Sequence, residues 1–150
     1  SFSTTNMLSE ENIVRQLSQA GYRITQPRRA VIRALLEEEG HLCPTELHQR
    51  ARLHCPTVGL VTVYRTLNLL AELNLVRRVH REDGCHGYLP ASPGHRHALI
   101  CRGCGRAAEF PGGDDLRALI EQVEAGTGYR VDDHLLQLFG LCPDCQEREA

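Results

Sequence analysis

The chain has 150 residues, of which 41% are hydrophobic and 24% charged, so it can form a packed core and is not a disordered chain. It contains no run of about 18 apolar residues, which excludes a transmembrane helix, and no secretory signal pattern at its start. Its seven cysteines are an odd number and cannot all pair with one another. Together with eight histidines, they predict a cytoplasmic protein whose Cys and His side chains serve metal or redox chemistry.

The basic residues are all arginine, and they are unevenly distributed along the chain. Residues 1–90 carry 11 Arg against nine acidic residues (net +2), whereas residues 91–150 carry six Arg against ten acidic residues (net −4). This asymmetry suggests two modules with different partners. A segment rich in Pro and Gly separates them, so we predict a first domain over residues 1–89, a hinge over 90–94 and a second domain over 95–150.

The first domain is predicted to form four helices followed by a hairpin. Ser9 and Thr25 are suitable N-caps, and Gly21 and Gly40 are suitable helix ends. An Asp-Gly pair at residues 83–84 predicts the hairpin turn. The predicted helices cover residues 9–21, 25–40, 44–53 and 59–73, and the predicted strands cover Val76–Val79 and His86–Leu89.

This order of elements is typical of a winged helix-turn-helix, in which the last helix enters the DNA major groove and the hairpin touches the flanking backbone. A single exposed Arg is usually only a solvated residue, but the set of polar and basic side chains on this framework favours double-stranded DNA as the partner. The candidate contacts on the last helix are Thr62, Arg65, Thr66 and Asn68, with Tyr64 nearby. Further phosphate contacts could come from Arg23, Arg28 and Arg29 at the second helix, and from Arg77, Arg78 and Arg81 on the hairpin.

Two Cys-x-x-Cys pairs organise the second domain: Cys101 with Cys104, and Cys142 with Cys145. Each pair can place two thiolates along one edge of a zinc tetrahedron, and two pairs complete a four-sulfur site without an open position. This predicts a structural Zn²⁺ ion that joins the two ends of a small domain. A redox pair or an iron–sulfur cluster is the alternative, although a redox motif explains one pair and not two.

The segment between the cysteine pairs predicts a small α/β unit. We expect a helix from Asp114 to about Gly126 and strands over Ala98–Ile100, Tyr129–Val131 and Leu135–Phe139. The fold class is therefore α+β: a winged helix followed by a small α/β domain. Because so small a unit has a thin core, we expect a metal or a dimer interface to stabilise it.

Further candidate metal ligands concentrate around the hinge. Imidazole, thiolate and carboxylate groups together form a zinc-like ligand set, and other divalent metals use overlapping sets. A cluster that spans a hinge would fix the angle between the two modules when it binds metal. The candidates are His41, Cys85, His86, His95, His97, Glu109 and His134, with His80 left open. We assign His48 and His54 to ordinary surface or core roles, and Cys43 and Cys55 to buried thiols.

The sequence also resembles the ferric uptake regulator superfamily over about Leu8 to Cys145. Three segments carry the resemblance: 21–29 (GYRITQPRR), 58–68 (VGLVTVYRTLN), and the pattern His95-x-His97-x-x-Ile-Cys101-x-x-Cys-Gly with the second cysteine pair. The resemblance implies a metal-responsive, homodimeric repressor with a winged-helix domain, a hinge and an α/β dimerisation domain. It also implies binding to palindromic operators of metal uptake genes, with no small-molecule substrate and no membrane partner.

The resemblance assigns roles to individual residues. Tyr64 and Arg65 match recognition-helix contacts, Arg23 and Arg28 match basic positions near the second helix, and the four paired cysteines match a structural zinc site. His41, His95, His97, Glu109 and His134 fall at or near regulatory ligand positions. The chain departs from the family at Arg77, where zinc sensors often supply a ligand, and its acidic ligand in the rear helix could be Asp114 or Asp115.

We predict that the second, regulatory metal is also Zn²⁺, because Cys85 would supply a soft ligand. The alternatives within the superfamily are an iron, manganese or peroxide sensor. A zinc-dependent enzyme that uses Cys85, His95 and Glu109 is a further alternative. We do not favour it, because the chain contains no His-Glu-x-x-His motif.

Overall fold

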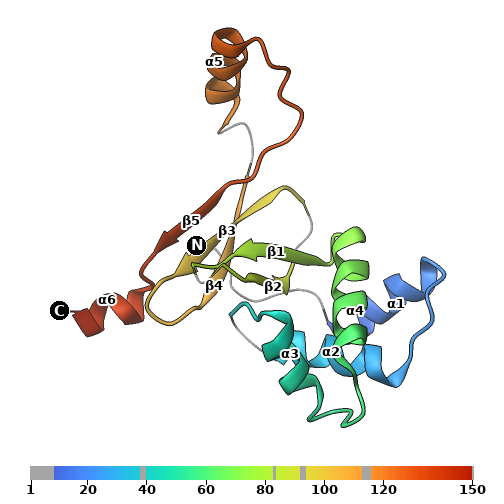
Figure 1. Cartoon of the computed structure of the whole chain (residues 1–150). Helices are drawn as coiled ribbons and strands as arrows, with labels where there is room; N and C mark the ends of the chain where they lie inside the picture. The colour runs from blue at the N-terminus through green and yellow to red at the C-terminus, as the bar shows by residue number, and fades with distance from the viewer. Residues whose placement is uncertain (1–8, 38–39, 83, 92–93, 113–115, 150) are drawn as a thin grey trace.

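The computed structural model describes residues 9–37, 40–82, 84–91, 94–112 and 116–149. Four helices come first: α1 (Glu10–Gln19), α2 (Gln26–Glu37), α3 (Pro44–Ala51) and α4 (Leu60–Glu72). A hairpin of β1 (Val76–His80) and β2 (His86–Pro90) follows, which we call the wing. The rest of the chain contains β3 (Arg96–Cys101), β4 (Ala107–Pro111), α5 (Arg117–Thr127), β5 (Gln137–Gly140) and α6 (Pro143–Glu149). The four helices gather on one side of the wing, and the second sheet lies on its other side (Figure 1). The predicted α+β winged-helix class is confirmed.

The helices begin at the capping residues that the sequence supplies. Ser9 Oγ accepts a hydrogen bond from the Asn12 N–H at 3.1 Å, which satisfies a donor that the first turn of α1 leaves open. At the start of α3, the Glu46 carboxylate accepts from the Cys43 N–H at 2.9 Å. Burial of Glu46 opposes its ionisation, but this hydrogen bond and the nearby Arg81 lower its pKa to about 2.

Two residues of α4 differ in burial from what their polarity suggests. Thr66 was expected on the exposed face, yet it is fully buried and its Oγ1 donates to the Thr62 carbonyl oxygen at 2.7 Å. A threonine can be buried within a helix because its hydroxyl bonds to the preceding turn. Leu60 is apolar, but it is 36% exposed because the first turn of α4 extends beyond the core.

The second sheet has the strand order β4-β3-β5. Strand β3 pairs antiparallel with β4 and parallel with β5, and the parallel ladder runs from Ala98↔Gln137 to Cys101↔Gly140. A parallel neighbour requires a long crossover, which here contains α5. Helix α5 stands apart from the rest of the chain (Figure 1), and none of its described residues is buried.

Several predicted elements of the second domain need correction. Residues Tyr129–Val131 do not form a strand: Tyr129 is 75% exposed, and the Val131 N–H bonds to the Glu124 side chain of α5 at 2.9 Å. In the described parts of the chain, no strand pairs with these residues, so their β-propensity is not enough to form one. The last strand begins two residues later than predicted, and β4 and α6 were not predicted. The predicted start of the rear helix at residues 114–115 lies outside the described residues.

The buried residues form two clusters, and the wing contributes to both. Val76 and Tyr88 pack with the core of α1–α4, whereas Val79 and Leu89 pack with Ala98 and neighbouring residues of the second sheet. The wing is thus held between the helices and the sheet. The domain limits and the hinge, of which residues 92–93 lie outside the described residues, stay a prediction.

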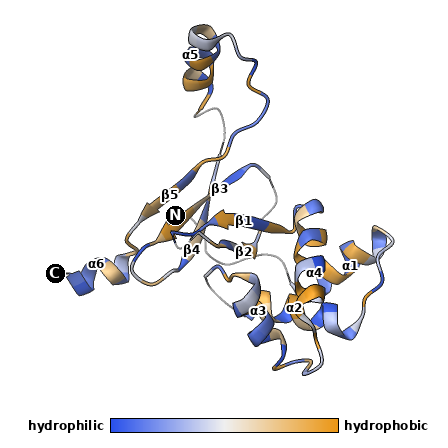
Figure 2. Ribbon diagram, viewed as in Figure 1, coloured by the Kyte–Doolittle hydropathy of each residue, from blue (hydrophilic) through white to orange (hydrophobic). Residues whose placement is uncertain are grey.

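Apolar side chains are exposed along α5 and β5, where orange segments are visible in Figure 2. The largest exposed groups in α5, β5 and the segment between them are Leu119, Val123, Tyr129, Leu135 and Leu138. In the described ranges, no helix is long and apolar enough to cross a membrane.

Candidate metal centres

The four paired cysteines meet at one end of the second sheet. Their sulfur atoms all lie within 4.8 Å of one another, and Cys104 Sγ is 3.8 Å from Cys142 Sγ. The edge of a tetrahedron with Zn–S bonds of about 2.3 Å is about 3.8 Å. Gly103 gives room for this arrangement, because a Cβ atom there would lie 2.7 Å from Cys145 Sγ. No disulfide joins any of the seven cysteines, all of which lie in described residues.

The electrostatics of this cluster favour a bound cation. Hydrogen bonds from backbone N–H groups, first that of Cys142 at 3.3 Å, lower the pKa of Cys101 to about 6 despite the opposing effect of burial. In contrast, the pKa of Cys145 is raised to about 12 by its hydrogen bond with the Cys142 sulfur and by burial. Four neighbouring sulfurs cannot all ionise without a positive charge to offset their repulsion. The four-sulfur cluster therefore fits a structural zinc ion.

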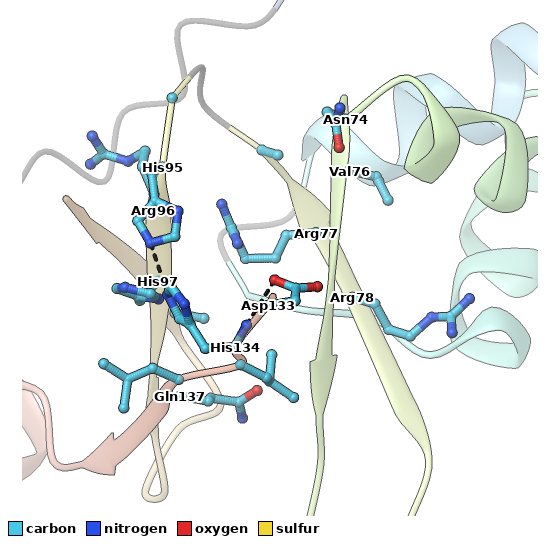
Figure 3. Close-up of a pocket in the computed structure, with 15 residues that line it drawn as sticks. Asn74, Val76, Arg77, Arg78, His95, Arg96, His97, Asp133, His134 and Gln137 are labelled. Carbon is cyan, nitrogen blue, oxygen red and sulfur yellow. Dashed lines mark hydrogen bonds between the residues drawn. The ribbon is translucent and has the colours of Figure 1, made fainter. Parts of the chain in front are cut away.

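Three histidines gather at the opposite end of the same strands. The ligand atoms of His95, His97 and His134 lie within 4.8 Å of one another. His95 Nε2 is 3.0 Å from His134 Nε2, and the His97 ring centroid lies 4.7 Å and 5.4 Å from those of His95 and His134. Figure 3 shows the three side chains meeting in a cavity of about 570 Å³. Three imidazoles at these distances can bind one divalent metal ion.

Gly112, just after β4, determines how closely these rings can pack. A Cβ atom at this position would lie 2.3 Å from His95 Cδ2 and 2.6 Å from His97 Nε2. Any side chain would therefore displace both rings. Gly112 was not predicted as a site residue, although a Gly-Gly pair at residues 112–113 is a sequence signal that the backbone approaches another group closely.

Glu109 does not lie among the histidine ligand atoms. Its side chain is 7% exposed, and its Oε2 accepts from Arg77 Nε of the wing at 2.7 Å. Arg96 Nε is 4.0 Å from the other carboxylate oxygen. On β1, Arg77 points toward the histidine side and Arg78 points away from it (Figure 3). The carboxylate is therefore neutralised by guanidinium groups, which the sequence analysis did not predict.

The other predicted regulatory ligands lie elsewhere. His80 and His86 face each other across the wing with ring centroids 5.2 Å apart, and Cys85 is exposed beside them. His41 lies against Gly87 of β2. Among the described residues, none of these four joins a group of three or more potential ligands. Asp114 and Asp115 lie outside the described residues.

The ordinary roles assigned to other residues have structural explanations. His48 Nε2 is 2.9 Å from the Val58 carbonyl oxygen, and His54 contacts the Glu37 carboxylate. Cys43 is buried as predicted, but Cys55 is only partly buried.

The predicted DNA-binding residues differ in how accessible they are. On α4, Tyr64 is 45% exposed and Arg65 is also exposed, whereas Thr62 is partly buried. Arg23 is exposed, but Arg28 is partly buried and its Nη1 donates to the Arg23 carbonyl oxygen at 2.7 Å. Three of the additional arginines are engaged within the protein: Arg29 with Glu10, Arg77 with Glu109 and Arg81 with Glu46.

The comparisons with known proteins agree with this arrangement. Residues 19–139 match the sequence profile of the Ferric uptake regulator family. The chain belongs to this family. Its members are metal-responsive, DNA-binding transcription regulators and not enzymes.

Individual relatives cover nearly the whole chain. The ferric uptake regulation protein of Bacillus subtilis (strain 168) is 35% identical over 145 residues, which are 93% of this chain and 96% of the relative. The peroxide operon regulator of the same organism is 30% identical over 135 residues, or 89% and 90% of the two chains. A solved zinc uptake regulator in complex with zinc and DNA has a TM-score of 0.74 and 22% identity, and the match covers 95% of this chain and 98% of that chain. This last likeness establishes the fold alone.

Replacing Cys142 with Ser should remove the tightly held zinc ion and unfold the second sheet, because zinc binding to such a site contributes to folding free energy. Zinc content and circular dichroism of the full chain would measure both effects. Cys55→Ser is the matched control, since Cys55 lies outside the cluster. Retention of one zinc ion and of native structure in Cys142→Ser would contradict the assignment.

Replacing Gly112 with Ala should weaken metal binding at the three histidines by about tenfold or more, since disturbing the surroundings that orient metal ligands typically costs 10–100-fold in metal affinity. Gly126→Ala is the control, because nothing lies within 4 Å of a Cβ atom there. Calorimetric titration of zinc into protein that already contains its structural zinc measures the effect. Equal affinities in the two variants would show that the rings need not pack as observed.

Proposed function

We propose that this protein is a zinc-responsive transcriptional repressor that acts in the cytoplasm and controls metal uptake genes. The observation that carries the proposal is the meeting of His95, His97 and His134 in a cavity that β1 of the wing also lines. A metal site at this place can influence the orientation of the DNA-binding half. The four-sulfur cluster has no open position, so it serves structure and not sensing.

The donor set supports zinc as the regulatory metal. Imidazole ligands suit zinc, copper, iron and nickel, whereas manganese and magnesium prefer carboxylate and water oxygens. Glu109, the buried carboxylate beside the site, is already paired with Arg77. The sequence-based preference for zinc depended on Cys85, which is not part of the cluster. The preference for zinc therefore rests on the three imidazoles.

DNA recognition is assigned to α4. Tyr64 and Arg65 lie exposed on this helix, where Arg can bind guanine bidentately and Tyr can hold a phosphate. Arg23 lies exposed before α2 and can add a phosphate contact. Thr62 and Arg28 are less accessible, and we assign them to positioning the exposed contacts.

The repressor acts as a homodimer on a palindromic operator. Two-fold symmetry of a dimer is matched by an operator with two related half-sites. Large exposed apolar groups on a small domain mark an interaction surface, and α5 and β5 carry several of them, including Leu119 and Leu138. A second copy of the chain would cover these groups.

Regulation requires that metal binds one arrangement of the two halves better than another. His97 lies in β3 and His95 just before it, and His134 comes from the segment before β5. When these three side chains share one ion, they hold the two strands together beside the wing. The arrangement so favoured is the one that places two copies of α4 on the operator.

Iron sensing is the second candidate. Imidazole also suits iron, and the Bacillus subtilis relative at 35% identity is a ferric uptake regulation protein.

A duplex selected from random DNA with each metal form of the protein provides the binding probe. At fixed salt, zinc should raise its affinity for the full chain at least tenfold, and iron(II) and manganese(II) should raise it less. His134→Ala should lose this response but keep the zinc of the four cysteines. Arg65→Ala, the control, should weaken binding with and without added metal while the zinc-induced ratio is retained.

A stronger response to iron(II) than to zinc would replace zinc by iron as the sensed metal. Affinity that is indifferent to all three metals would overturn the proposal that the protein is a sensor.

A further inference from the structure

Polar contacts attach the wing to the second sheet: an exposed ion pair between Glu82 of the wing turn and Arg102, and two sets that involve the wing strands themselves. Gln137, the first residue of β5, holds the backbone of His80 with both ends of its side-chain amide. The His80 N–H donates to Gln137 Oε1 at 2.9 Å, and Gln137 Nε2 donates to the His80 carbonyl oxygen at 2.7 Å. His80 is the last residue of β1, so this pair of hydrogen bonds fixes the end of the strand that leads into the wing turn.

The position of Gln137 relates it directly to the three histidines. The pair Ala98↔Gln137 is the first rung of the parallel ladder between β3 and β5. His97 immediately precedes Ala98, and His134 lies three residues before Gln137. Side chains of His97 and His134 that share an ion would therefore join the two strands just before their first rung. The chain from His134 to Gln137 covers three residues, which span about 10 Å when extended. This short segment has little freedom when both of its ends are held.

The second attachment does not involve the histidine ligand atoms. Arg77 of β1 donates to the buried Glu109 carboxylate of β4 at 2.7 Å, and Arg96 of β3 approaches the same carboxylate. A guanidinium–carboxylate contact of this kind needs no metal ion to form. This contact can hold the wing to the sheet with or without bound metal.

We propose that Gln137 is the positioning residue that transmits metal binding at the histidines to the wing, whereas the Arg77–Glu109 pair is a metal-independent attachment. The proposal rests on the proposed function, since it requires a metal ion at His97 and His134. It adds that metal changes the wing through β5 and the His80 backbone. When the histidine site holds no metal, the start of β5 is less restrained, and Gln137 bonds to the His80 backbone for a smaller fraction of the time.

Hydrogen–deuterium exchange of the full chain tests this division of roles. The protein keeps its structural zinc, and one further equivalent of zinc is added. In the native protein, the added zinc should slow exchange of residues 76–90 by about fivefold, the factor expected for one net hydrogen bond. In Gln137→Ala, this slowing should fall below about twofold, while the number of bound zinc ions and the mass of the assembly stay unchanged.

Two further variants complete the design. Gln49→Ala, an exposed glutamine on α3, is the matched control and should respond to zinc like the native protein. Glu109→Gln should raise exchange of the wing both with and without added zinc, while the zinc-induced ratio is retained. Gln137→Glu keeps an acceptor for the His80 N–H but has no donor for its carbonyl oxygen, so its response should be reduced.

The outcomes separate the two proposals. An undiminished zinc response in Gln137→Ala would overturn the role of Gln137. A native wing that does not respond to zinc would also overturn it. In that case, the zinc stoichiometry shows whether the proposed function fails as well: a second bound ion that His134→Ala removes leaves the regulatory site intact, and its absence does not.

Discussion

The parallel pairing of β3 with β5 brings together residues that lie far apart in the sequence, and both candidate metal centres depend on it. At one end of this ladder, Cys101 pairs with Gly140, and the chain then reaches Cys142. At the other end, Ala98 pairs with Gln137, and His97 and His134 lie just before this first pair in their segments. A single strand pair thus has a four-sulfur cluster at one end and three imidazoles at the other.

The two ends have different chemistry, and this difference suits two roles. Four sulfurs complete a tetrahedron, and the raised pKa of Cys145 reflects how strongly they need a shared cation. The three imidazoles line a cavity of about 570 Å³ and leave room for another ligand. A closed site that stabilises the strand pair, and a more open site that responds to metal supply, fit a regulator whose fold must persist when its sensed metal is scarce.

Local patterns in the sequence predicted the features that depend on near neighbours. Helix caps such as Ser9 and the spacing of Cys101 and Cys104 involve residues within one turn or one knuckle, so they could be read directly. Strand β4 was missed because Ala107, Ala108, Glu109 and Pro111 have low β-propensity, and it forms through pairing with β3. Helix α6 begins with Pro143 and Asp144, a start signal that was present in the sequence but overlooked.

The composition of the histidine site could only be partly predicted. His95 and His97 share a strand face by their spacing, but His134 joins them through the register of a parallel crossover, which no local pattern encodes. The pairing of Arg77 with Glu109 likewise joins residues 32 positions apart. In this structure, the carboxylate of Glu109, a predicted metal ligand, takes part in the attachment between the wing and the sheet.

Anomalous X-ray scattering at the zinc edge, from crystals of the zinc-loaded full chain, tests the central claim most directly. We expect two peaks in each chain: one inside the four-cysteine cluster and one bound by His95, His97 and His134. A second peak at Cys85, at His41 or on Glu109, or no second peak, would contradict the assignment of the regulatory site to the three histidines.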